Sequence, residues 1–88
     1  MHCTFDIAKD QTNTAKHGLS LAQAKALEWG SAVTWPDNRR DYGEPRQCAL
    51  GYIGDRLVSV VFVDRGDSRR IISLRKANKR EEKIYAET

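Results

Sequence analysis

The stretch Leu57-Val58-Ser59-Val60-Val61-Phe62-Val63 is the most apolar part of this 88-residue chain. Valine and phenylalanine favour extended structure, and four of the seven residues are valine. The apolar residues follow one another instead of alternating with polar ones. A strand with this pattern is buried on both faces, so the stretch is predicted to be the central strand of a sheet.

Turn signals flank this strand. Gly54-Asp55 before it and Gly66 after it are typical of tight hairpin turns, which join antiparallel neighbours. The pattern then predicts three more strands, at residues 32–35, 46–53 and 70–75. A polar loop at residues 37–44 separates the first two of these, and residues 3–5 could add a short edge strand.

Helix-capping residues lie on either side of these strands. Asp6 is a good N-cap for a helix from Ile7 to Lys16, which Gly18 would end. Ser20 is expected to cap a second helix that runs to about Trp29. The last helix follows a capping box at residues 78–81 and reaches about residue 87.

The predicted order of elements gives an α+β fold. It has two N-terminal helices, a four-stranded antiparallel sheet and a C-terminal helix, with the helices on one face of the sheet. Residues 1–88 are expected to form a single domain, since the chain has no room for a second core.

Composition narrows the class of protein. No apolar run is long enough to span a bilayer, and the first residues lack the features of a secretion signal, so a cytoplasmic protein is expected. Cys3 and Cys48 are not in a Cys-x-x-Cys pair and are predicted to be small buried or half-buried side chains. The histidines and cysteines lack the spacing of a zinc site, so neither a metal nor another cofactor is expected.

Positive charge is concentrated near the C-terminus. Residues 65–83 hold eight Lys or Arg against three Asp or Glu, whereas the net charge of the whole chain is only +3. A local basic surface of this kind indicates a phosphate-bearing partner such as a nucleic acid. The cations expected to bind RNA there are Arg69, Lys76, Lys79 and Arg80.

The predicted strand at residues 70–75 divides its side chains by alternation. Arg70, Ile72 and Leu74 would point one way, and Ile71, Ser73 and Arg75 the other. An arginine at a strand end is often a structural residue that extends its charge to water. The density of cations favours a functional interpretation here, because the guanidinium fork binds phosphate bidentately and can stabilise a phosphorane.

Arginine is a poor general base, so an RNA-cleaving centre would need other groups to move protons. The candidates are Lys16, His17, Glu44 and Tyr85. Histidine has the pKa nearest neutrality, although a His just before a helix-ending glycine is also a common structural cap. Tyr85 is expected to pack against the sheet more readily than to act in catalysis.

Three blocks of sequence resemble the BrnT toxin family. They are Phe5-Asp6-x-x-Lys9-x3-Asn13-x2-Lys16-His17-Gly18-x-Ser20-x3-Ala24, then Asp41-Tyr42-Gly43-Glu44-x-Arg46-x3-Leu50-Gly51, and finally Arg70-Ile71-Ile72-Ser73-x-Arg75-Lys76-Ala77-x3-Glu81-x3-Tyr85. They occur in order and span nearly the whole chain, whereas the segment at residues 33–40 has little distinctive match.

The resemblance implies a toxin of a type II toxin–antitoxin system with a RelE-like ribonuclease fold, which cuts RNA without a metal and halts translation. It also implies a BrnA-like antitoxin with a ribbon-helix-helix part, a 2:2 complex that represses its own operon by binding the operator through the antitoxin, and a bacterial cytoplasm. By position, Arg70 and Arg75 become the expected active-site arginines, with Arg46 as support and Lys16, His17 and Glu44 as weaker candidates.

Two alternatives stay open at this point. The same cations would serve a non-catalytic nucleic-acid-binding module or co-repressor subunit that only grips phosphates. They would also serve a protein that presents its basic face to an acidic partner. Only the ribonuclease hypothesis predicts new RNA ends.

Overall fold

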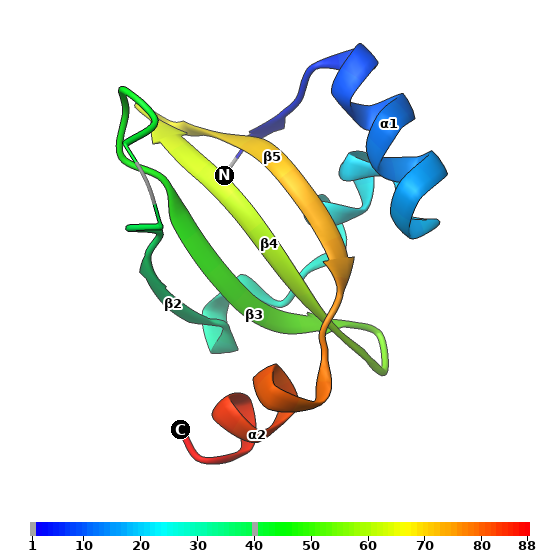
Figure 1. Ribbon diagram of the computed structural model, residues 1–88, viewed down its shortest axis with the longest axis vertical. Helices are drawn as coiled ribbons and strands as arrows, with labels where there is room; N and C mark the ends of the chain where they lie inside the picture. The colour runs from blue at the N-terminus through cyan, green and yellow to red at the C-terminus, as the bar shows by residue number, and fades with distance from the viewer. Residues whose placement is uncertain (1, 40) are drawn as a thin grey trace.

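The computed structural model describes residues 2–39 and 41–88 and places the predicted apolar stretch at its centre (Figure 1). Strand β4, Arg56–Arg65, lies between β3, Gln47–Ile53, and β5, Ser68–Lys76. Every residue from Leu57 to Val63 is buried. The prediction of a central strand is therefore confirmed.

The sheet has five strands in the order β1-β5-β4-β3-β2. Strands β2, Val33–Pro36, to β5 form the predicted antiparallel meander. Strand β1, His2–Thr4, pairs in parallel with residues 68–70 of β5. The expectation of a four-stranded, purely antiparallel sheet is thus wrong. The pairing joins residues that are far apart in the sequence, and a three-residue strand carries no local signal that would reveal its partner.

The N-terminal half contains one α-helix instead of two. Helix α1, Ile7–His17, has the predicted caps: the Asp6 carboxylate accepts from the Lys9 amide at 3.0 Å, and Gly18 has a φ of 73°. The second segment is a 3₁₀ helix, η1, Leu21–Ala26, followed by a 3₁₀ turn, η2, Trp29–Ser31. Its apolar residues recur every three positions, which is the period of a 3₁₀ helix.

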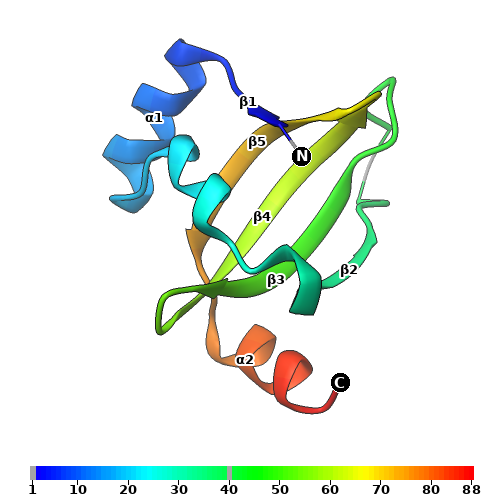
Figure 2. The same cartoon turned by 180° about the vertical axis from the view of Figure 1, so that it is seen from behind.

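The 3₁₀ helix η1 (cyan) covers one face of the sheet, called here the covered face, and α1 lies along the edge formed by β5 (Figure 2). The core on this side includes Leu21, Phe62 and Leu74, whose side chains are fully buried. Gly51 lets the chain pass closely here, because a Cβ atom would lie 3.1 Å from the Leu27 side chain. Asn13 of α1 bonds to both backbone groups of Leu74 and so satisfies the outer edge of β5.

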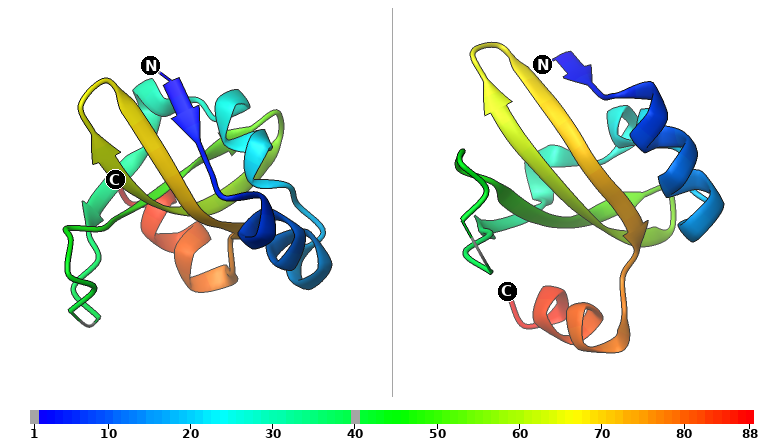
Figure 3. Two further views of the ribbon diagram at one scale, coloured as in Figure 1. Left: turned by 90° about the horizontal axis from the view of Figure 1, so that it is seen from above. Right: turned by 45° about the horizontal axis from the view of Figure 1, so that its top comes forward.

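The C-terminal helix, α2, Lys79–Ala86, lies at one end of the opposite face, called here the open face (Figure 3). Its Tyr85 ring packs edge-on against Tyr52, and the small cluster beneath includes Leu50 and Leu57. The expectation that all helices share one face is therefore wrong. Successive side chains of β3 and β4 point to opposite faces, and α2 packs on the face that presents Leu50 and Leu57. The sequence pattern alone does not show which of the two faces a helix will cover.

A register shift interrupts the pairing of β4 with β5. Val61 pairs with Ser73 and Phe62 with Ile71, so Ile72 is an extra residue on β5. Arg70 pairs with Val63 and Arg75 with Ser59, and these two partners lie on the same face of β4. The bulge thus brings Arg70 and Arg75 to the open face together, whereas simple alternation predicted opposite faces.

Candidate functional site

A polar groove crosses the open face between α2 and the loop that joins β2 to β3. It has a volume of about 230 Å³ near Arg75 and continues towards Arg46 past the shared residues Arg39, Val61 and Ser73. We call it the arginine groove. Its polar lining residues are Asp37, Asn38, Arg39, Tyr42, Arg46, Ser59, Ser73, Arg75 and Glu81.

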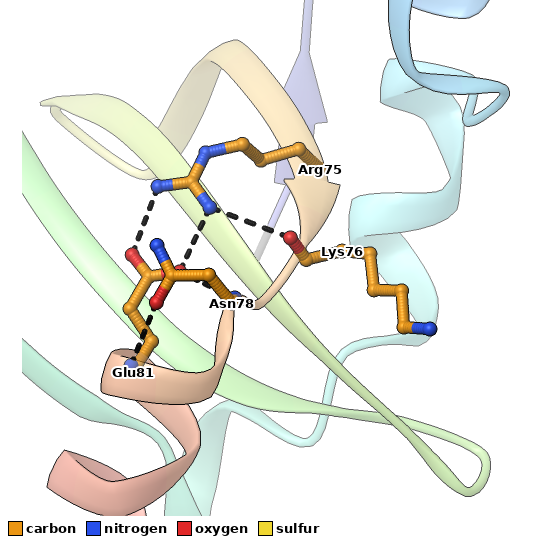
Figure 4. Close-up of polar contacts among 4 residues, drawn as sticks. All are labelled: Arg75, Lys76, Asn78 and Glu81. Atoms are coloured by element: carbon orange, nitrogen blue, oxygen red, sulfur yellow. Dashed lines mark hydrogen bonds and ion pairs between the residues drawn. The ribbon is translucent and has the colours of Figure 1, made fainter.

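Arg75 is held at one end of the arginine groove by α2 (Figure 4). Its two terminal nitrogens donate to the two carboxylate oxygens of Glu81 at 2.8 and 2.9 Å. One of them also donates to the carbonyl of Lys76 at 3.3 Å. A bidentate pair fixes the plane of the guanidinium, so Arg75 presents its remaining edge in one orientation.

Glu81 has a second role, because it closes the capping box of α2. Its carboxylate accepts from the Asn78 amide at 3.0 Å, and the Asn78 side chain accepts from the Glu81 amide at 2.8 Å. Partial burial disfavours the charged carboxylate, but the hydrogen bonds from Arg75 and Asn78 outweigh it and lower the pKa of Glu81. The same side chain therefore starts the helix and positions the arginine.

A second bidentate pair lies across the arginine groove. Arg39 donates from Nε and a terminal nitrogen to Asp37 at 2.7 and 2.8 Å. The Asp37 side chain is buried, whereas that of Arg39 is 69% exposed. The hydrogen bonds from Arg39 lower the pKa of Asp37 from 3.8 to about 2, against the effect of burial. Arg39 is thus anchored at its inner edge and open to solvent elsewhere.

Arg46 has the least satisfied guanidinium of the arginine groove. Its central carbon lies 4.0 Å from the centre of the Tyr42 ring, which it stacks upon. Its Nε atom is buried and has no hydrogen-bond partner among the described residues. A buried N–H without a partner is costly, so this position favours an incoming acceptor such as a phosphate oxygen.

Arg70 and Arg69 are neighbours with different surroundings. Arg70 lies on the open face, half-buried, and its side chain has no hydrogen-bond or ion-pair partner within residues 2–39 and 41–88. Arg69 points to the covered face, where it pairs with Asp64 at 2.7 Å and lies 4.6 Å above the Trp29 and Phe62 rings. Arg70 therefore shares the open face with Arg75 but pairs four residues further along β4 and does not line the arginine groove, whereas Arg69 lies on the covered face.

The other residues expected in the site are spread more widely. Glu44 lines a hollow beside Arg46 but binds Arg65 at 3.0 Å, which neutralises its charge. Lys76 is exposed and points away from Arg75 (Figure 4). Lys79 and Arg80 are exposed in the first turn of α2. Tyr85 donates to the Ser31 carbonyl at 3.2 Å and packs against Tyr52 of β3, which agrees with the prediction that it packs against the sheet.

Lys16 and His17 lie at the end of α1, outside the arginine groove. They line a second hollow between α1 and the outer edge of β5, which also includes Ile72 and Ser73. The arginine groove shares these last two residues. The two hollows therefore meet at the bulge of β5, and Lys16 and His17 approach the arginines only across this strand.

Several groove residues were not anticipated from the sequence. Arg39 and Asp37 come from the segment with little distinctive family match, and their Asp-x-Arg spacing was the one available signal of a bidentate pair. Ser59 is the one polar residue of the apolar run at residues 57–63, and Ser73 lies between Ile72 and Leu74 of β5. Cys48 also lines the floor as a free thiol, and burial raises its pKa. Cys3 is free and half-buried, so both cysteine predictions are confirmed.

Guanidinium groups and hydroxyls of this kind favour a phosphodiester. Three arginines line the two adjoining hollows of the groove, on a face that the N-terminal elements leave uncovered. Two of them are aligned by carboxylates, and the third has a buried Nε without a partner among the described residues. Within the described residues, no group of three or more His, Cys, Asp or Glu side chains is placed to hold a metal ion. In the same part of the chain, no helix is long and apolar enough to cross a membrane.

Comparison with known proteins gives one match. A family model described as the ribonuclease toxin BrnT of type II toxin–antitoxin systems matches residues 5–81, which include every strand from β2 to β5 and the whole arginine groove. No curated protein matches the chain.

Proposed function

The chain belongs to the BrnT family of ribonuclease toxins of type II toxin–antitoxin systems, and from this we propose that it is a metal-independent endoribonuclease that inhibits translation by cleaving RNA in the arginine groove. The observation that carries the proposal is that Arg39, Arg46 and Arg75 line two adjoining hollows of the open face, with Arg39 shared by both. The sequence resemblance supports the absence of a metal from the reaction.

The reaction we propose is an internal transesterification. The ribose 2′-oxygen attacks the adjacent phosphorus and gives up its proton to a base. The bond from phosphorus to the 5′-oxygen then breaks, and that oxygen takes a proton. The products are a 2′,3′-cyclic phosphate, which water can open to a 3′-phosphate, and a new 5′-hydroxyl. Negative charge builds on the non-bridging oxygens in between, where fixed cations are most effective.

The arginines have distinct roles in this proposal. Arg46, which stacks on Tyr42, and Arg70, which has no hydrogen-bond or ion-pair partner among the described residues, bind the phosphate oxygens through their guanidinium groups. Arg75 is oriented by Glu81 and adds its charge to the transition state without moving. Preorganised donors of this kind cost no reorganisation during the reaction.

Proton transfer falls to carboxylate, histidine or lysine side chains. His17 and Lys16 are two of the sequence-based candidates and line the hollow that shares Ser73 with the arginine groove. Glu44 would first have to leave Arg65. Glu81 lines the groove itself, although its lowered pKa makes it a weak base.

The family relationship also supports finer proposals about partners. We propose a RelE-like fold relationship, a BrnA-like antitoxin with a ribbon-helix-helix part, a 2:2 complex, operator binding through the antitoxin alone and a bacterial cytoplasmic location. An antitoxin that covered the open face would neutralise the toxin by excluding RNA.

The test is cleavage of labelled RNA by the purified chain in EDTA. The parent protein is expected to give new 5′-hydroxyl ends, and Arg75→Ala is expected to give none while remaining folded. Arg56→Ala is the matched control, because Arg56 is exposed at the start of β4 and lines no part of the groove.

Binding without cleavage, both in buffer and with translating ribosomes, would contradict the enzyme. It would favour the alternative of a non-catalytic nucleic-acid-binding or co-repressor subunit. Cleavage only with translating ribosomes would keep the enzyme and make it ribosome-dependent.

A further inference from the structure

The hollow beside α1 differs in charge from the arginine groove. It has a volume of about 350 Å³, and its charged or titratable lining residues are Lys9, Lys16 and His17. No Asp or Glu lines it, whereas Asp37 and Glu81 line the arginine groove. We call it the α1 groove. Its positive charge is not neutralised from within.

The geometry of α1 explains this charge. Lys9 and Lys16 are seven positions apart, which is two helical turns, so they lie on one side of the helix. The acidic Asp10 faces the other way, where it accepts from the Ser20 hydroxyl at 2.9 Å and the Leu21 amide at 2.7 Å. Within the part of the chain that the structure describes, Lys9, Lys16 and His17 form no ion pair.

The opposite wall of the α1 groove is the outer edge of β5. Strand β1 covers this edge only at residues 68–70, and Asn13 covers it at Leu74. Ile72, the bulge residue, and Ser73 lie between these two covers and line both grooves. An extended ligand can therefore pass from one groove to the other over a single strand.

We infer that the α1 groove is a phosphate subsite for the RNA strand that flanks the cleaved bond. This inference rests on the proposed function and adds the path of the substrate to it. A single-stranded RNA with its reacting phosphate at Arg46 would cross β5 at Ser73 and place a neighbouring phosphate between Lys9 and Lys16. Duplex RNA does not suit the path, because the strand must pass between α1 and the sheet edge.

The test measures binding separately from cleavage. The ligand is a fluorescent single-stranded RNA with 2′-O-methyl groups, which lacks the nucleophile and stays intact. Affinity is measured over a series of salt concentrations for the parent chain, Lys9→Gln, Lys16→Gln and the double variant. Lys25→Gln is the matched control, because Lys25 is exposed on η1 and lines neither groove.

Each lysine that contacts a phosphate contributes about 0.7 to the slope of log affinity against log salt for a single strand. We expect the slope to fall by about 0.7 in each single variant and by about 1.4 in the double variant, with the Lys25→Gln slope equal to that of the parent. Unchanged slopes in folded variants would overturn the subsite, as would an equal loss in the control.

The outcome is distinguishable from failure of the enzyme itself. If the lysine variants have reduced slopes but the parent chain cleaves no RNA, the α1 groove is supported as a binding site and the proposed catalysis is contradicted. If the parent cleaves RNA but the lysine variants keep its slope, the catalysis is supported and the subsite is contradicted. If Lys16 instead serves only the C-terminus of α1, Lys16→Gln would lower the unfolding temperature and leave RNA affinity unchanged, which would overturn its place in the subsite.

Discussion

The two faces of the sheet use the same strands for different purposes. On the covered face, Val58, Val60 and Phe62 of β4 lie in a continuous apolar core beneath η1. On the open face, the alternate residue Ser59 and its partner Arg75 line a polar groove that α2 covers at one end only. Burial on one face supplies the stability that lets the other carry unpaired charge.

Arg69 and Arg70 show the same division within two residues. The first lies over Trp29 and Phe62 with its charge paired, and the second, on the opposite side, has no ion-pair partner among the described residues. Composition cannot separate them, because both are arginines of one basic run. The direction of each side chain from the strand decides which contributes to packing and which is available to a phosphate.

The largest difference between the faces should be in stability. Phe62→Ala empties the middle of the covered-face core and is expected to lower the free energy of unfolding by about 3–5 kcal/mol. Ser73→Ala, on the open face, should change it by less than about 0.5 kcal/mol. Denaturant unfolding of both variants measures this. A comparable loss in the two variants would mean that the open face also carries the core.

Activity should show the opposite pattern at the adjacent arginines. Arg70→Ala is expected to slow RNA cleavage by about 100- to 1,000-fold, as for loss of one preorganised donor, with little change in stability. Arg69→Ala should cost about 1–2 kcal/mol of stability through its cation–π and ion-pair contacts, and less activity than Arg70→Ala. Cleavage rates and unfolding midpoints of both variants decide it. Equal activities would remove the functional distinction between the two faces.

The link between α2 and the sheet should be measurable as a coupling. Arg75→Ala and Glu81→Ala, alone and together, form a double-mutant cycle for the half-buried ion pair. We expect a coupling of about 1–2 kcal/mol in unfolding free energy, since the pair is bidentate but not fully buried. Additive effects would show that Glu81 serves only its capping box. Because the ion pair lowers the pKa of Glu81, the coupling should weaken when acid protonates this carboxylate.

The smallest expected effect is the acid dependence of Asp37. Its pKa falls from 3.8 to about 2 on folding, so its ionised form contributes stability above pH 3.8 that is lost as the pH falls through about 2. The exposure of Arg39 reduces this contribution to about 1 kcal/mol. Unfolding of the parent and Asp37→Asn between neutral pH and acid should converge at low pH. A constant difference at every pH would contradict the linkage.

Much of the fold follows from local sequence. The apolar run at residues 57–63, the hairpin turns and the caps at Asp6, Gly18 and Asn78 each act within a few residues, so pattern and propensity suffice to predict them. The second helix was mistaken because a spacing of three suits both helix types over two turns. The parallel pairing of β1 depends on contacts with residues 68–70, which no local pattern contains.

The candidate site divides in the same way. Arg46, Arg70 and Arg75 were identified as phosphate-binding candidates from residue type and family blocks, and their roles stay predictions. Asp37, Arg39 and Ser73 became visible only as groove residues, because they come from different segments of the chain. These residues matter because the fold places them in the groove. Neither a serine hydroxyl nor an ion pair has a distinctive sequence spacing that would predict such a position.

The sequence by itself determined the central strand, the charge concentrated after it and the family to which the chain belongs. The tertiary structure alone decided which cations share a face of the sheet. A single extra residue at Ile72 reverses the alternation along β5 and turns Arg70 towards the side of Arg75. The physical reason is that alternation has a period of two, so one bulge changes the face of every side chain beyond it, and only the pairing with β4 reveals where the bulge lies.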